Sequence, residues 1–213
     1  MNINLSSILY FSLSNPDNGT LFDMRDGQSY KVVKIGNQIW TAENFRYLPP
    51  EEEGGELCVY DNDYGCFYDW NTAKLIPPEG WKLPSMDDFK KLKNFIIKDN
   101  NLKPVGIKPV YKSLYPSISR FLRTKGLGTF FGNDKYGFNV KPAGFINTSH
   151  YNLNGHVGNL NMHVGHEANF WTDNEEIPVF IEFNSDDNCE LELQPHKGDP
   201  IKHLFNVRLI KNL

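Results

Sequence analysis

The apolar positions between Glu79 and Ile96 change from a spacing of two to a helical spacing. Trp81 and Leu83 alternate with polar residues, Pro84 ends this run, and Ser85 can cap a helix. Apolar residues then recur three or four positions apart, at Phe89, Leu92, Phe95 and Ile96. The pattern predicts a helix from about Ser85 to Lys98 whose apolar face packs into the core beside Trp81.

Short apolar runs on both sides of this helix predict strands. They are expected at residues 30–35 and 38–41, which Gly36-Asn37 would join as a hairpin, and at residues 57–60, 136–140, 143–146, 170–172, 179–183, 189–193 and 204–210. Short helices are expected at residues 69–75 and 118–122. Trp40 shares the apolar alternation of its strand, so we expect both Trp40 and Trp81 to be core residues.

Chain length and the frequent Gly and Pro residues limit the classes of fold that the chain can adopt. The 213 residues contain 17 Gly and 13 Pro, which argues against a helical bundle, and they show no internal repeat. We therefore expect one α+β domain over residues 25–213. Residues 1–24 form a leading segment, expected to dock on the domain or on a partner such as a sister subunit.

The net charge, the apolar runs and the cysteines argue against nucleic-acid binding, membrane insertion, secretion and a cysteine metal site. A net charge of -4 supplies no basic field for nucleic acid, and no apolar run is long enough to insert in a membrane. The apolar run Ile8 to Phe11 has no Lys or Arg before it, so a secretory signal peptide is not expected. Cys58, Cys66 and Cys189 lack metal-ligand spacing and are interpreted as reduced thiols. Both features favour synthesis in a reducing cytoplasm, with the final location left open.

Several short motifs occur in an order that resembles a known family. They are Val33 to Asn44, Cys58 to Trp70, Pro78 to Ser85, Tyr136 to Asn139 with Pro142 to Gly144, Phe170 to Glu175, and Phe205 to Ile210. From about residue 26 to the end, the chain resembles the Fibrobacter succinogenes major paralogous domain, a family widespread in the Bacteroidetes. Exported members often carry cysteines where this chain has Pro78 and the neighbourhood of Tyr64, so Cys58 lacks those partners here, which agrees with the expectation of no signal peptide.

The resemblance implies a C-type-lectin-like fold, shared with formylglycine-generating enzymes and phage receptor-binding variable proteins. Two helices would flank a small twisted antiparallel sheet, with long loops at one end. Trp70 would lie on the first helix, Asp87 to Lys98 on the second, and Val207 in the last strand. The paired-cysteine copper site of the formylglycine-generating enzymes is not carried over, because the cysteines here fall elsewhere in the motif order.

Two groups of side chains are candidate metal ligands. Asp61, Asn62 and Asp63 can offer oxygen atoms to calcium, or can form a turn whose side chains cap backbone amides. His163 and His166, with Glu167, can form part of a zinc or nickel site, or can belong to an exposed polar loop.

The Asn- and His-rich stretch from Asn147 to Asn169 has the composition of a binding loop. Its candidate ligand contacts are Asn147, Tyr151, Asn152, Asn154, Asn159, Asn161, His163 and His166, with Trp171 beneath them as support. No Ser-His-Asp signature, phosphate loop or dinucleotide fingerprint is present.

The sequence therefore favours a non-catalytic module that binds a glycan or a protein. One alternative is a structural subunit of a phage or contractile injection particle, which would assemble through the apolar residues of the leading segment. The other is an enzyme similar to the formylglycine-generating enzymes, for which no catalytic residues are assigned.

Overall fold

The computed structural model describes residues 19–50, 58–104, 106–107, 113–114, 118–126, 129–130, 132–148, 161–174, 176–184, 192–196 and 202–213. Residues 1–18 of the leading segment lie outside this set. The last part of that segment forms β1 (Thr20–Phe22), which pairs antiparallel with β2 (Ser29–Ile35). The sheet of the domain thus begins at Thr20 rather than after residue 24.

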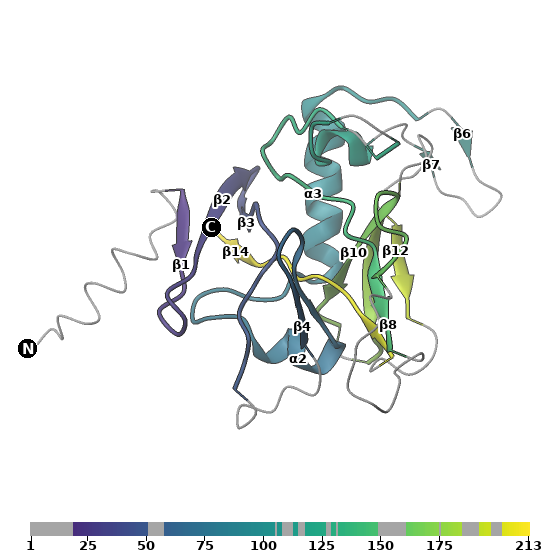
Figure 1. Cartoon of the computed structure of the whole chain (residues 1–213). Helices are drawn as coiled ribbons and strands as arrows, with labels where there is room; N and C mark the ends of the chain where they lie inside the picture. The colour runs from purple at the N-terminus through teal and green to yellow at the C-terminus, as the bar shows by residue number, and fades with distance from the viewer. Residues whose placement is uncertain are drawn as a thin grey trace, which may run out of the picture.

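The first sheet joins strands from the two ends of the described chain. Its order is β1, β2, β3 (Gln38–Thr41) and β14 (Ile210–Asn212), all antiparallel (Figure 1). β2 alternates buried and exposed residues, and Gly36 takes a left-handed φ of 61° in the turn to β3. The predicted hairpin of residues 30–41 is confirmed, and β14 closes the sheet beside β3.

Two α-helices occur in the described part of the chain, and each begins at a side-chain cap. The Asp69 carboxylate accepts the backbone N–H groups of Asn71 and Thr72 at the start of α2 (Trp70–Leu75). Ser85 and Asp88 form a capping box at the start of α3 (Met86–Asp99). Both helices were predicted, and for α3 the prediction rested on the Ser85 cap and the apolar spacing that follows it.

The remaining strands form further antiparallel sheets. A three-stranded sheet has the order β10 (Glu167–Thr172), β11 (Val179–Asn184) and β12 (Glu192–Pro195), and another has the order β13 (His203–Leu204), β8 (Phe145–Asn147) and β9 (Asn161–Met162). Two-stranded sheets are formed by β4 (Cys58–Asp61) with β5 (Gly65–Tyr68), and by β6 (Gly106–Ile107) with β7 (Ser113–Leu114). A 3₁₀ helix covers Ile118–Phe121.

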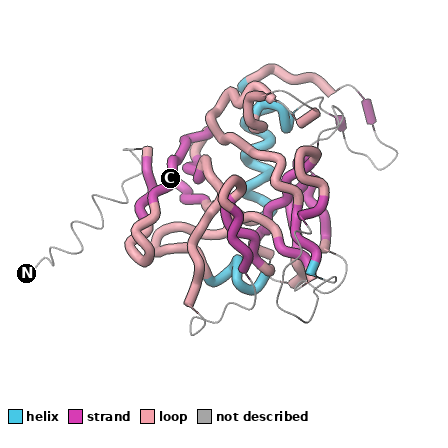
Figure 2. The backbone as a smooth tube through the Cα atoms, in the orientation of Figure 1, coloured by secondary structure: helices cyan, strands magenta, loops and turns pink. Residues whose placement is uncertain are grey.

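These elements make an α+β domain in which α3 lies between the first sheet and the β10–β12 sheet in the view of Figure 1. Loops connect short elements over much of the backbone (Figure 2). Trp40 is fully buried in one apolar cluster with residues of α3, and Trp81 is 7% exposed in a second cluster. The prediction that both tryptophans are core residues is confirmed.

Two predicted strands were wrong. Residues 136–140 do not form a strand, because Gly137 and Asn139 take left-handed φ angles of 69° and 55° that interrupt regular extended backbone, and only Val140 makes an isolated bridge, to Arg123. The run 204–210 is not one strand either: Phe205 bridges Tyr68, Asn206 bridges Phe170, and β14 starts only at Ile210. Val207 consequently lies outside the strands, although the resemblance placed it in the last one.

The β4–β5 hairpin brings two of the three cysteines together. Cys58 and Cys66 are free thiols on neighbouring diagonal positions of the hairpin. The hydrogen bond with Cys66, and burial, raise the pKa of the Cys58 thiol above its usual range. Cys189 lies outside the described residues, so its predicted state is not tested.

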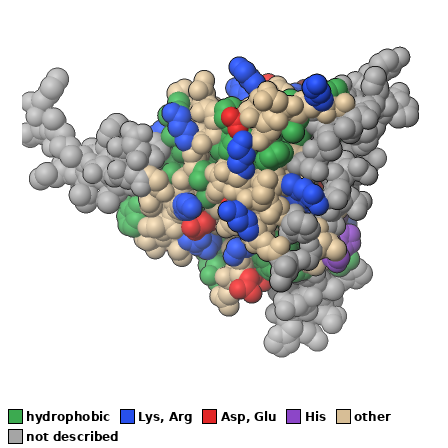
Figure 3. Space-filling view, turned by 90° about the horizontal axis from the view of Figure 1, so that it is seen from above, with side chains coloured by type: hydrophobic (Ala, Val, Ile, Leu, Met, Phe, Trp, Pro, Cys, Tyr) green, Lys and Arg blue, Asp and Glu red, His purple; other side chains and the backbone are tan. Residues whose placement is uncertain are grey.

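The helices and the surface charges can be compared with the expectation that the chain neither inserts in a membrane nor binds nucleic acid. No helix among the described residues is long and apolar enough to cross a membrane. On the face shown in Figure 3, Lys and Arg side chains are spread out, with a few Asp and Glu side chains between them. The absence of a nucleic-acid partner stays a prediction.

Two buried tyrosines predict loss of stability at alkaline pH. Burial raises the pKa of Tyr30 and of Tyr68 well above the usual value of about 10. The unfolded chain loses these protons near pH 10 while the folded chain keeps them, so stability is complete below pH 10 and falls above it. Urea unfolding at pH 9 and pH 11 should show a smaller fall in Tyr30→Phe than in the parent chain. An equal fall in both would show that Tyr30 does not contribute.

Candidate functional site

A pocket of about 390 Å³ lies between the β10–β12 sheet and the β13–β8–β9 sheet. We call it the aromatic pocket and define it by Phe145, Glu167, Phe180, Glu182, His203 and Phe205. These residues come from β8, β10, β11, β13 and the segment after β13, so the pocket exists only once the two sheets are assembled.

The pocket wall follows from the side-chain alternation of a strand pair. In the register of β10 and β11, Trp171 faces Phe180, Asn169 faces Glu182, and Glu167 faces Asn184. Because side chains alternate between faces, these six residues share one face, while Phe170, Ile181 and Phe183 point to the opposite face and join the core. One face therefore carries carboxylates, amides and aromatic rings rather than aliphatic groups.

Aromatic rings form the floor and one side of the pocket. The Phe205 ring centroid lies 4.3 Å from that of Trp171 and 4.7 Å from that of Phe180. The Phe145 ring stands edge-on to Phe205 at 5.8 Å. Trp171 is fully buried, and its indole N–H donates to the Tyr68 carbonyl at 2.7 Å, which fixes the floor in place.

Two histidines lie beside these rings. Nε2 of His196 and Nδ1 of His203 are 2.7 Å apart, so one nitrogen donates a hydrogen bond to the other. The His203 ring is stacked with Phe205 at an interplanar angle of 10°. Burial lowers the pKa of His203, which keeps its imidazole neutral at pH 7. At neutral pH His203 thus offers a polar group to the pocket without adding positive charge.

Two carboxylates complete the lining, and amides hold each of them. Glu167 accepts a hydrogen bond from the Asn169 amide at 2.9 Å and lies 3.1 Å from Nδ1 of His163. Glu182 accepts from the Asn184 amide at 3.0 Å. The lining thus combines apolar ring faces with fixed acceptors and amide donors, a combination that can pack against the C–H face of a ligand and bond its hydroxyl groups.

The structure brings some of the predicted binding residues to this pocket. Trp171 lies under it, and His163 contacts both Phe145 and Glu167 at its edge. Asn147 ends β8 opposite His203. Asn161 lies in β9, and His166 is exposed in the turn before β10. Tyr151, Asn152, Asn154 and Asn159 lie outside the described residues.

In the structure, the side chains of the two predicted metal sites contact other protein groups. Oδ1 of Asp61 accepts the backbone N–H groups of Asp63 at 2.8 Å and Tyr64 at 2.9 Å, which is the turn considered as the alternative to calcium binding. His163 pairs with Glu167. Within the part of the chain that the structure describes, no group of three or more His, Cys, Asp or Glu side chains could hold a metal ion.

Sequence reasoning missed most of the pocket. Phe145, Phe180, Glu182, His203 and Phe205 come from separate strands, and the loop composition did not point to them. A usable signal was present: Glu167, Asn169 and Trp171 alternate with Ala168, Phe170 and Thr172, which marks a strand with one functional and one buried face.

Fold and pocket define a small α+β domain with curled antiparallel sheets and an aromatic pocket between two of them. The family model described as the Fibrobacter succinogenes major domain matches residues 33–211, and the chain belongs to this family. No curated protein and no solved structure matches the chain.

Proposed function

We propose that this chain is a non-catalytic binding module that recognises a saccharide unit in the aromatic pocket. The observation that carries the proposal is the shared face of β10 and β11, where aromatic rings, carboxylates and amides converge on one hollow. The rings supply apolar contact area that suits the C–H face of a sugar. Glu167 and Glu182 accept hydrogen bonds from hydroxyl groups.

The size and rigidity of the pocket support a small, specific ligand. Its volume of about 390 Å³ falls within the roughly 300–1,000 Å³ that is usual for ligand sites. Trp171 and Asn169 are buried under it, and each side chain has a hydrogen-bond partner. A binding surface held in this way loses little side-chain entropy when a ligand arrives.

We also propose that the fold is C-type-lectin-like. Supporting this, β14 near the chain end pairs with β3 near its start, and two helices accompany small antiparallel sheets. Fold alone does not assign a ligand, so the saccharide proposal depends on the pocket.

The test is binding of the full chain to an array of glycans, followed by calorimetric titration with the glycan that binds. Glu182→Gln removes a charged acceptor and should weaken binding by about tenfold or more, because a hydrogen bond to a charged group contributes about 1.5–3 kcal/mol. Phe180→Ala removes part of the ring surface and should also weaken binding, with thermal melting measured to show that the variant is folded.

Phe95→Ala is the matched control, since Phe95 is a partly buried aromatic residue of α3 outside the pocket. It should leave the affinity unchanged. No glycan binding, or equal affinities in Glu182→Gln and the parent chain, would overturn the proposal. Protein binding that is lost only when residues 1–15 are deleted would favour the structural-subunit alternative instead.

A further inference from the structure

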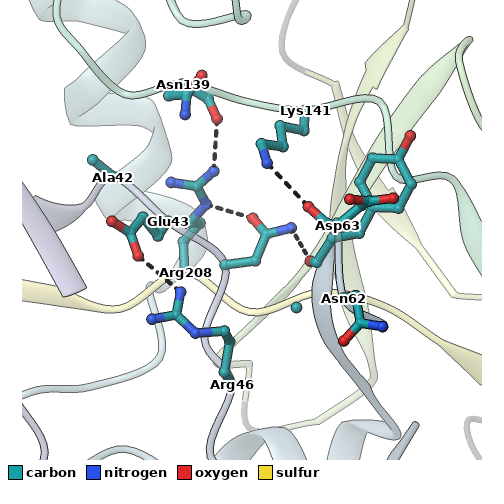
Figure 4. A pocket seen from close by; sticks show the side chains of 11 residues that line it. Ala42, Glu43, Arg46, Asn62, Asp63, Asn139, Lys141 and Arg208 are labelled. Carbon is teal, nitrogen blue, oxygen red and sulfur yellow. Dashed lines mark hydrogen bonds and ion pairs between the residues drawn. The ribbon is translucent and has the colours of Figure 1, made fainter. Parts of the chain in front are cut away.

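A second hollow, of about 250 Å³, lies where four distant segments of the chain meet (Figure 4). Its charged lining comes from Glu43 and Arg46 after β3, Asp63 in the β4–β5 turn, Lys141, and Arg208 before β14. We call it the Arg208 pocket. It shares no lining residue with the aromatic pocket, so it is a separate candidate site.

Close backbone packing fixes the walls of the Arg208 pocket. The Asn44 amide donates to the Tyr64 carbonyl at 2.7 Å and thereby joins the segment after β3 to the β4–β5 turn. Gly65 takes a φ of 80°, and a Cβ atom there would lie 3.1 Å from Cβ of Asn44. The Lys141 ammonium donates to the Asp63 carbonyl at 3.0 Å (Figure 4). The charged groups are therefore held on a rigid frame.

Arg208 is buried, with 1% of the residue exposed, and its guanidinium is held by oxygen atoms that carry no full charge. Nε donates to Oδ1 of Asn44 at 2.8 Å, and Nη2 donates to the Asn139 carbonyl at 3.0 Å (Figure 4). Nη1 donates to the carbonyls of Thr41 and Phe138. Since a guanidinium has five N–H donors, one N–H of Nη2 is left over.

The charges around this pocket do not cancel. Arg46 forms an ion pair with Glu43 at 2.8 Å, which leaves Arg208 and Lys141 as cations and Asp63 as the remaining acid. In the described part of the chain, neither Arg208 nor Lys141 has a carboxylate within 4.0 Å. Burial lowers the pKa of Arg208 to about 9, so the group is still charged at pH 7. The carboxylates of Glu43 and Asp134 attract this charge from beyond contact distance, which offsets only part of the cost of burial. An anion in contact with the guanidinium would offset more of that cost.

We infer that the Arg208 pocket binds an oxyanion, either a carboxylate or a sulfate or phosphate group, between the guanidinium of Arg208 and the ammonium of Lys141. The spare N–H of Arg208 and the remaining N–H groups of Lys141 supply charged donors, which suit an oxyanion better than a neutral ligand. The small volume restricts the ligand to one such group or to a single sugar acid.

The test uses the full chain with sodium sulfate, inorganic phosphate and glucuronate, each at an ionic strength matched with sodium chloride. Glucose is the uncharged counterpart of glucuronate. We expect at least one of the three anions to raise the melting temperature and to bind in calorimetric titration, and glucose to do neither. If no anion stabilises the protein more than sodium chloride does, the inference is wrong.

Two variants locate the binding. Lys141 is exposed, and Lys141→Ala should weaken the affinity for the anion by about tenfold or more, since a charged hydrogen-bond donor is lost. Lys90→Ala is the matched control, because Lys90 is an exposed lysine of α3 outside the pocket. Equal weakening in both variants would show a general charge effect and overturn the assignment.

Asp63→Asn is expected to strengthen anion binding, a result that an unfolded variant could not give. The Asp63 contacts in the turn use its backbone N–H and C=O, so the substitution leaves them in place. Removing the carboxylate removes repulsion between like charges, and the anion should bind more tightly by a few-fold. Unchanged or weaker binding in Asp63→Asn would contradict a site that is selective for anions.

Discussion

Replacement of Trp40 by alanine is expected to lower the free energy of unfolding by about 3–5 kcal/mol. Trp40 is fully buried on β3, with ring centroids of Phe89 at 5.0 Å and Phe138 at 5.5 Å. These neighbours belong to α3 and to the turn segment before Val140, so the indole joins three parts of the fold. Its removal leaves a cavity that rigid neighbours cannot fill.

Trp40→Phe is the control for this prediction, with urea unfolding as the measurement. Within the described residues the indole Nε1 of Trp40 has no hydrogen-bond partner. Phenylalanine keeps most of the ring and removes this buried N–H, so it should cost less than half as much as alanine. If Trp40→Ala costs less than about 1 kcal/mol, the ring does not support the core as described.

The sequence predicts best the elements whose signals are local. Ser85 and the apolar spacing after it specify α3, and Gly36-Asn37 between alternating residues specifies the β2–β3 hairpin. The run 136–140 fails because its apolar residues look like a strand, whereas Gly137 and Asn139 take left-handed backbone angles. The prediction of one strand over residues 204–210 is wrong because successive residues pair with different segments, first with Tyr68, then with Phe170 and finally with Trp40. Only the assembled fold shows these changes of partner.

The candidate sites were harder to predict for a related reason. Loop composition pointed toward His163 and Trp171, which do lie at and under the aromatic pocket. Phe180 and Glu182 enter it through the register of β10 with β11, and Phe205 enters through the approach of the segment after β13. The register of two strands and the packing of one sheet against another depend on residues far apart in the chain, so they cannot be read from a single sequence.

Arg208→Leu is expected to destabilise the fold by at least about 3 kcal/mol, although leucine is a good core residue. Replacement of a buried charge by an apolar group can be neutral where its partners are replaced as well. Here four acceptors would remain, namely Oδ1 of Asn44 and the carbonyls of Thr41, Phe138 and Asn139. Each buried oxygen left without a donor costs about 1–3 kcal/mol, and this sum exceeds the gain from removing the charge.

Arg208→Lys separates the contribution of the charge from that of the hydrogen-bonding geometry. Lysine keeps a positive charge, but its three N–H groups radiate from one nitrogen and cannot reach four acceptors that surround a planar guanidinium. Unfolding in urea should therefore rank the chains as parent, then Arg208→Lys, then Arg208→Leu in decreasing stability. A leucine variant as stable as the lysine variant would show that the four acceptors find other donors. Because Asn44 and Asn139 also line the Arg208 pocket, loss of this guanidinium should loosen the pocket walls together with the fold.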